Sequence, residues 1–142
     1  MALIKRSQTY TQAAITSTVY SDLTTNLGVH PQKLDLYLEV NEEAVKRSIT
    51  NILLTDRGER LFNPVFGSSI RGLLFENISP QTEAALKSAV ENAIENFEPR
   101  ASLIDVFVQP MPDENAYAVT VAFGIINSPE PIVLELLLNR IR

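Results

Sequence analysis

The clearest structural signal in the chain is the stretch Tyr117-Ala118-Val119-Thr120-Val121-Ala122-Phe123-Gly124-Ile125. Large apolar side chains stand at every second position of this stretch, and small side chains fill the positions between them. In a β-strand successive side chains point to opposite faces of the sheet. The alternation therefore predicts a strand whose large-residue face is turned to a core and whose small-residue face is turned away from it.

Two further stretches with the same period lie before and after this strand. Their regularly spaced apolar residues are Ile104, Val106 and Val108, and then Ile132, Leu134, Leu136 and Leu138. Turns are expected from Pro110 to Asn115 and from Asn127 to Pro131. Three consecutive strands with short connections predict an antiparallel meander.

Before residue 100 the apolar residues instead repeat at spacings of three and four, which is the period of a helix. Asn41 is a suitable N-cap for a first helix, which is expected to end near Thr55. Ser79-Pro80 gives a second helix an N-cap and a proline at its first position, and Pro99 ends this helix. Between them, residues 68–75 are compatible with a short helix.

The expected fold is therefore α+β, with two main helices packed on one face of a small antiparallel sheet. Residues 31–142 are expected to form a single domain, because a chain of 142 residues fits one hydrophobic core. Residues 1–30 are expected to form an extended N-terminal arm. Ser, Thr and Gln crowd residues 7–26, and the apolar residues there are too dispersed for a strand or a helix face.

Composition argues against several classes of function. The net charge is −5, with 17 acidic and 12 basic residues, and this balance argues against a nucleic-acid partner. The chain has no cysteine, so disulfides, thiol catalysis and thiolate metal sites are excluded. No apolar run reaches the length of a membrane span or follows the basic N-terminus as a secretory signal would, so neither is expected.

No cofactor or metal is expected either. The one histidine, His30, precedes a proline and has no neighbours at the spacing of a metal site, so a turn or surface role is expected for it. A Ser/His/Asp triad would have to use this histidine. Neither Gly58 nor Gly67 is followed by the Lys-Ser/Thr pair of a phosphate-binding loop.

The loop Gly58-Glu59-Arg60-Leu61-Phe62-Asn63-Pro64-Val65-Phe66-Gly67, its continuation in Leu73-Leu74-Phe75-Glu76, and the triplet Glu98-Pro99-Arg100 resemble the gene-25-like baseplate wedge family. The likeness covers roughly Leu38 to Leu138. This family includes wedge subunits of contractile-tail phages and a baseplate subunit of type VI secretion. The resemblance implies a structural protein of the virion tail baseplate, made in the host cytoplasm and present in six copies. A subunit of a related injection system is the alternative.

The resemblance also implies that the triplet Glu98-Pro99-Arg100 contacts the helical core bundle of the larger wedge proteins. The residues themselves favour a partner, because Glu98 falls at the negative end of a helix dipole and needs a cation nearby. Arg100 presents a planar fork that holds a carboxylate in two bonds. Arg60 is expected to bind a partner together with the triplet. The alternative is an internal pair of Glu98 with Arg100 or with Arg60, which would cap the helix.

The last strand is a second candidate for partner binding. Its members Ile132, Leu134, Leu136 and Leu138 share one face. The resemblance implies that this domain takes part in sheath attachment by strand exchange, with the sheath and tube proteins as partners. At a sheet edge, the unpaired backbone groups of the strand accept a strand from another chain. A buried central strand is the alternative.

Phe62, Phe66 and Phe75 are expected to anchor the Gly/Pro loop in the core.

Members of the family have often been labelled lysozymes, and a glycosidase needs two carboxyl groups about 5 to 9.5 Å apart. Only Glu76 and Glu98 qualify as a pair, and each has a structural explanation, so no catalytic residue is expected.

Overall fold

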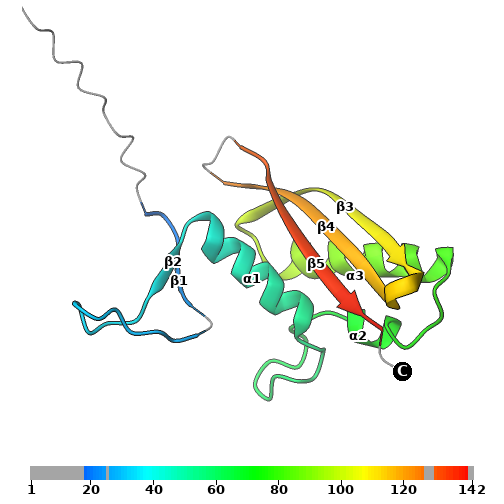
Figure 1. The fold of residues 1–142 in the computed structure, drawn as a ribbon, viewed down its shortest axis with the longest axis horizontal. Coiled ribbons are helices and arrows are strands. Elements are labelled where there is room, and N and C mark those ends of the chain that lie inside the picture. Colours follow the sequence, from blue (N-terminus) through cyan, green and yellow to red (C-terminus); the bar gives the residue numbers. More distant parts are fainter. Residues whose placement is uncertain (1–17, 25, 127–129, 141–142) are drawn as a thin grey trace, which may run out of the picture.

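The structure, a computed structural model, describes residues 18–24, 26–126 and 130–140 (Figure 1). It is an α+β fold, as predicted. In chain order the elements are β1 (Ser21–Leu23), β2 (Leu38–Val40), α1 (Glu42–Leu54), α2 (Ile70–Leu73), α3 (Pro80–Phe97), β3 (Ala101–Met111), a 3-10 turn (Pro112–Glu114), β4 (Ala116–Ile125) and β5 (Ile132–Asn139).

The C-terminal half forms a three-stranded antiparallel sheet in the order β3-β4-β5, which confirms the predicted meander. Tyr117 of β4 lies opposite Pro110 of β3 and Leu138 of β5. The large residues of β4 are all buried, and the small residues between them are half-buried on the other face. The alternation of large and small side chains therefore sets which face of the sheet carries the core.

Helices α1 and α3 lie on the same side of this sheet and cover its large-residue face (Figure 1). The two helices also contact each other, so one core fills the space between them and the sheet. Its largest fully buried members from the helices are Val45, Ile49, Ile52, Leu86, Val90 and Ile94, and those from the sheet are Val106, Tyr117, Val119, Val121 and Phe123.

The two helix starts are at the predicted residues, but only one of them is capped as predicted. Ser79 accepts a hydrogen bond from the Thr82 N–H at 3.2 Å, and Pro80 is the first residue of α3. Asn41 is the N-cap of α1 but makes no capping hydrogen bond with its side chain. Its Oδ1 accepts instead from the Val19 and Tyr20 N–H groups, at 2.8 and 3.3 Å. Asn41 therefore ties the N-terminal segment to the start of α1.

The predicted alternation, in which Ile104 shares one strand face with Val106 and Val108, is wrong at Ile104. The register of β3 against β4 shifts between Leu103 and Asp105, which leaves Ile104 as an extra residue. A β-bulge of this kind reverses the alternation of side chains. Leu103 therefore packs on the core before the bulge and Val106 after it, while Ile104 is 61% exposed.

The expectation that no strand forms between residues 7 and 26 is wrong at β1. Ser21–Leu23 pairs antiparallel with Leu38–Val40, and the two strands form a separate sheet that stands away from the C-terminal sheet (Figure 1). The partner strand lies beyond a turn, so the local pattern of side chains did not indicate it. Residues 1–17 of the predicted arm lie outside the described residues, as do residues 127–129 of the second predicted turn.

Candidate functional site

Glu98 lies at the C-cap of α3, where the helix gives way to β3. Its backbone N–H donates to the Ile94 carbonyl at 2.9 Å, and its own carbonyl accepts from the Ala101 N–H at 3.2 Å. Its side chain is only 2% exposed, in the same range as the apolar core residues. A carboxylate this deeply buried needs compensating charge and hydrogen bonds.

Arg100 supplies that compensation. Its Nε donates to Glu98 Oε1 at 2.6 Å, and its Nη2 donates to Oε2 at 2.7 Å, so the guanidinium holds both carboxylate oxygens. Of the two internal pairs considered for Glu98, this one forms. Arg60 instead places its guanidinium 3.9 Å above the Phe66 ring.

The pair stays charged because of its surroundings. Burial raises the pKa of the Glu98 carboxyl, but hydrogen bonds from Arg100 and Ser48 and the positive charge of Arg100 outweigh it. The pKa of Glu98 therefore lies below its ordinary value of 4.5, and Glu98 in turn raises the pKa of Arg100. Ser48 belongs to α1, so the pair joins α1, the end of α3 and the start of β3.

Arg100 is more exposed to solvent than Glu98. Its side chain is 31% exposed, its Cζ lies 5.5 Å from the centre of the Tyr20 ring, and Asp22 of β1 adds a favourable charge. Its Nη1 makes no hydrogen bond to a described residue.

The sequence did not indicate Ser48 or Tyr20 as neighbours of the triplet, because both come from segments far away along the chain. Pro99 separates the two charged residues in the turn that leads into β3.

Among the residues that the structure describes, β5 pairs with β4 alone, so it is an edge strand of the three-stranded sheet. It is not the central strand that was the alternative. The core-facing side chains of this strand are the four expected ones, of which the first and last are buried and the middle two partly buried: Ile132, Leu134, Leu136 and Leu138. The open features of β5 are therefore its outer backbone edge and the side chains on its opposite face.

The three phenylalanines of the Gly/Pro loop differ in their placement. Phe66 packs on Phe97, the last residue of α3, with ring centres 5.1 Å apart. Phe62 is fully exposed, and Phe75 is more than half exposed. The prediction of a core anchor is therefore confirmed for Phe66 and wrong for Phe62 and Phe75, since nothing in the sequence distinguished the three.

The carboxyl pair nominated for a glycosidase does not come together. Glu76 lies just before α3, where its Oε2 is 3.5 Å from the Thr82 hydroxyl, and Glu98 lies at the other end of this helix. At 1.5 Å per residue, about 24 Å of helix separates Thr82 from Glu98. A glycosidase holds its two carboxyl groups within about 9.5 Å, so these two glutamates do not form such a site.

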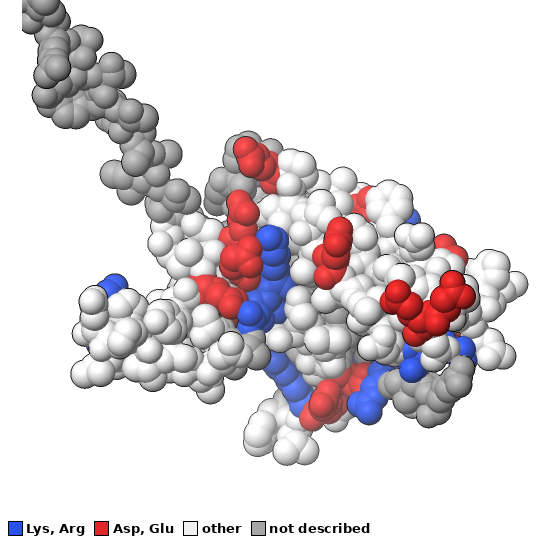
Figure 2. Space-filling model, in the orientation of Figure 1, with Lys and Arg blue, Asp and Glu red and all other residues white. Residues whose placement is uncertain are grey.

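Other sites are not evident in the part of the chain that the structure describes. His30 forms a turn, as predicted, with its Nδ1 accepting from the Gln32 and Lys33 N–H groups at 3.2 and 3.3 Å. Among described residues, no cluster of three or more His, Asp or Glu is placed to hold a metal ion. None of the described helices has the length and apolar character needed to cross a membrane. Figure 2 shows acidic and basic side chains interspersed on the face in view.

Comparison with known proteins gives matches over most of the chain. The sequence model of the family described as baseplate wedge protein gp25 matches residues 39–130. Baseplate wedge protein gp25 of Enterobacteria phage T4 is 32% identical over 114 residues, which make up 80% of this chain and 86% of the phage protein.

Solved structures give the same fold. A putative tail lysozyme from Geobacter sulfurreducens aligns with a TM-score of 0.70 and 27% identity, over 75% of this chain and 97% of that chain. A chain of the six-fold symmetrised anti-feeding prophage baseplate aligns with a TM-score of 0.60 and 22% identity, over 87% of each chain. A chain of the type VI secretion baseplate complex gives 0.54 and 16%, over 67% of this chain and 91% of that chain.

The two baseplate structures are too distant in sequence to show more than the shared fold. The phage T4 relative and the family match carry the assignment, because each extends over more than half of the chain. They agree with the resemblance found in the loop and the triplet. This chain therefore belongs to the gp25 family of baseplate wedge proteins, which are structural proteins of phage tails.

Proposed function

We propose that this chain is a wedge subunit that joins the wedge core bundle to the tail tube and the first sheath ring of a contractile phage tail. It acts by binding neighbouring proteins and has no catalytic role. Six copies enter each baseplate, and the chain reaches the virion after assembly in the host cytoplasm. Its 32% sequence identity to a baseplate wedge protein over most of its length supports this proposal.

The observation that carries the proposal is the partly exposed side chain of Arg100, whose guanidinium is held by the buried carboxylate of Glu98. A long side chain normally loses conformational freedom when it enters an interface, which weakens binding. Arg100 has lost this freedom before a partner arrives. Its Nη1 is available to an acceptor on the core bundle, such as a carboxylate or a helix carbonyl. Glu98 therefore acts as a positioning residue, and Arg100 makes the contact.

The outer edge of β5 is the second binding site in this proposal, and its partner is a sheath subunit. Alternate residues of an edge strand direct their backbone N–H and C=O groups away from the sheet, where another strand can pair with them. Strand exchange with a sheath subunit would extend the order β3-β4-β5 by one strand. The core-facing residues Ile132, Leu134, Leu136 and Leu138 hold β5 in register for this pairing and support the site from within.

The enzyme alternative has less support. The word lysozyme describes the Geobacter relative, and the nominated glutamates of this chain lie at opposite ends of α3. The injection-system alternative is favoured only by likenesses in fold, whereas the phage relative is also similar in sequence. We therefore retain the phage-tail assignment.

Co-purification with the wedge proteins of the same tail tests the proposal. Arg100→Lys keeps the charge but loses the two-bond fork. We expect it to fold and to co-purify at least about tenfold less wedge protein, as for the loss of an interface arginine. Lys87→Ala removes another ion-paired cation, 3.1 Å from Asp105, and should co-purify like the wild type.

Two results would overturn the proposal. The first is wild-type co-purification by Arg100→Lys. The second is muralytic turnover by the pure protein that disappears in Glu76→Gln or Glu98→Gln. Glu98→Ala is a poor probe of the interface, because removal of the buried carboxylate disturbs the fold.

A further inference from the structure

A loop of residues 57–67, called here the tip loop, projects from the domain between α1 and α2. Its outermost side chains are Leu61, Phe62 and Val65, and all three are exposed, Phe62 completely. In Figure 2 the projecting end of the loop stands out below α1 as a knob without charged side chains. Single exposed apolar residues are ordinary on a protein surface, but a group that includes a fully exposed aromatic residue indicates a binding site.

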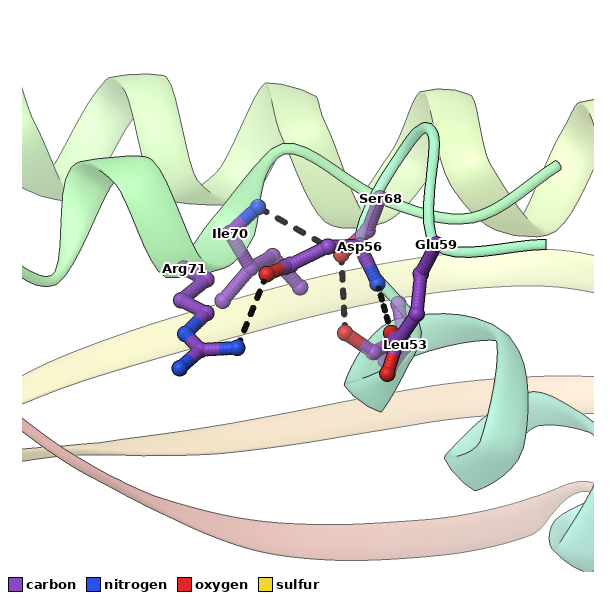
Figure 3. Close-up of polar contacts among 6 residues, drawn as sticks. All are labelled: Leu53, Asp56, Glu59, Ser68, Ile70 and Arg71. Carbon is purple, nitrogen blue, oxygen red and sulfur yellow. Dashed lines mark hydrogen bonds and ion pairs between the residues drawn. The ribbon is translucent and has the colours of Figure 1, made fainter. Parts of the chain in front are cut away.

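The base of the tip loop is closed by polar contacts (Figure 3). The buried Ser68 hydroxyl donates to the Leu53 carbonyl at 2.8 Å and accepts from the Ile70 N–H at 3.3 Å. Arg71 forms an ion pair with Asp56 at 3.2 Å, which joins α2 to the end of α1. These bonds fix the two ends of the loop relative to the core.

Contacts within the loop set its shape. The Gly58 N–H donates across the loop to the Pro64 carbonyl at 2.9 Å. Gly67 has a φ of 114°, and Phe66 beside it turns inward onto Phe97. The exposure of Phe62 therefore belongs to a loop with a defined conformation, and a loop ordered before binding loses less entropy on binding.

The charges next to the tip are basic. Arg57 and Arg60 make no ion pair with any described residue, and Arg60 instead covers Phe66. The one acidic residue of the loop, Glu59, accepts a hydrogen bond from the Asp56 N–H at 3.0 Å. The tip loop is thus an apolar knob with two unpaired arginines, on a chain whose net charge is −5.

We propose that the tip loop inserts Phe62 into an apolar pocket rimmed by Asp or Glu side chains on another protein of the same assembly. Aromatic anchors in pockets carry much of the binding energy of protein interfaces, and complementary rim charges steer the encounter. Two arginines on an acidic chain are too few to bind a nucleic acid or a strongly anionic surface. The inference rests on the proposed function only in that the partner is sought within the tail.

Photocross-linking in purified tails tests this proposal. The full chain carries p-benzoylphenylalanine in place of Phe62, and mass spectrometry identifies the peptide that it captures. The expected product is one peptide of another tail protein, with apolar residues flanked by Asp or Glu. The same cross-linker in place of Phe107, which is exposed on β3, is the control and should not capture that peptide. Incorporation of the chain without any adduct at position 62 would overturn the proposal.

Binding measurements with the captured protein complete the test. Phe62→Ala should bind about 30-fold more weakly, as expected for loss of an interface hot spot, and Arg57→Glu should bind more weakly in a salt-dependent way. Phe107→Ala should bind like the wild type. Wild-type binding by Phe62→Ala would overturn the inference, as would Phe62-dependent binding to phosphatidylglycerol vesicles, which would indicate a membrane contact. If Arg100→Lys still fails to co-purify wedge proteins in that case, the proposed function stands.

Discussion

Arg100 and Glu98 form a two-bond ion pair in which only one partner is shielded from water. Both guanidinium–carboxylate distances are below 2.8 Å, yet Glu98 is sealed at the end of α3 while a third of Arg100 is exposed. The two residues therefore play different roles. Glu98 carries the cost of burying a charge, and Arg100 both compensates it and remains accessible to another molecule.

Because only Glu98 is shielded from water, substitutions of Arg100 and of Glu98 should lower the free energy of unfolding by different amounts. Arg100→Ala leaves a buried carboxylate without its cation and should lower the free energy of unfolding by about 3 kcal/mol. Glu98→Gln leaves a guanidinium that water can reach, so we expect a loss of about 1 to 2 kcal/mol. Urea denaturation at pH 7 measures both. Lys87→Ala, which breaks a surface pair, should change stability by less than about 1 kcal/mol. Equal losses of stability in Arg100→Ala and Glu98→Gln would contradict the different roles of the two residues.

The lowered pKa of Glu98 predicts a pH dependence of stability. Because the pKa in the folded state lies below the ordinary 4.5, the stabilisation from Glu98 is complete above pH 4.5 and disappears as the pH falls through the folded value. Arg100→Ala removes the guanidinium charge and its hydrogen bonds, while burial, Ser48 and the backbone of residue 100 still act on the carboxyl. The pKa of Glu98 therefore rises in this variant, and protonation at low pH removes the cost of burying an unpaired charge. The stability gap between wild type and Arg100→Ala should therefore narrow from pH 7 to pH 4. A constant gap would argue against a charged pair.

Among the glycines in and beside the tip loop, Gly67 should be the one whose replacement by alanine destabilises the fold most. A Cβ at Gly67 would lie 2.4 Å from the Thr55 carbonyl oxygen, and φ is 114°, so Gly67→Ala should cost about 3 kcal/mol or more. Gly58 has a φ of 89° with open space around it, so Gly58→Ala should cost about 1 kcal/mol. Gly72 in α2 has open space and no positive φ, so Gly72→Ala should be neutral or slightly stabilising. Thermal melting of the three variants gives the ranking, and a different order would contradict this account of the loop.

The sequence was sufficient where one face of one element decided the structure. β4 alternates between large and small side chains without interruption, which predicted the strand and its buried face. α3 begins with Ser79-Pro80, which predicted where the helix starts. The sequence was insufficient where the determinant lies elsewhere in the chain. The bulge at Ile104 depends on pairing with β4, and β1 depends on a partner strand beyond a turn.

Part of the candidate site was also predictable from the sequence, and part of it was not. The affinity of Glu98 for Arg100 follows from their charges and their separation by one proline, and it was predicted as one alternative. The burial of Glu98 was not, because it results from the approach of α1 with Ser48. Phe62 and Phe66 are the same residue type in one loop, and only their packing against α3 distinguishes the core anchor from the exposed tip.

The bulge itself can be tested by mutation. Ile104 and Val106 share the same alternation in the sequence, but one is exposed and the other is fully buried. Ile104→Ser should change the free energy of unfolding by less than about 0.5 kcal/mol, as at a surface site. Val106→Ala should lower it by about 2 kcal/mol, because it leaves a cavity in the core. A comparable loss in both variants, measured by denaturant unfolding, would indicate a regular strand without the bulge.

The most direct test of the account is a reconstruction of the assembled tail baseplate at a resolution that shows side chains. We predict that the Arg100 guanidinium still holds both oxygens of Glu98 and also lies within hydrogen-bond distance of an acceptor on a core-bundle protein. A reconstruction in which this guanidinium faces solvent, with no other polypeptide within about 4 Å, would contradict the claim that Arg100 joins this subunit to its neighbours.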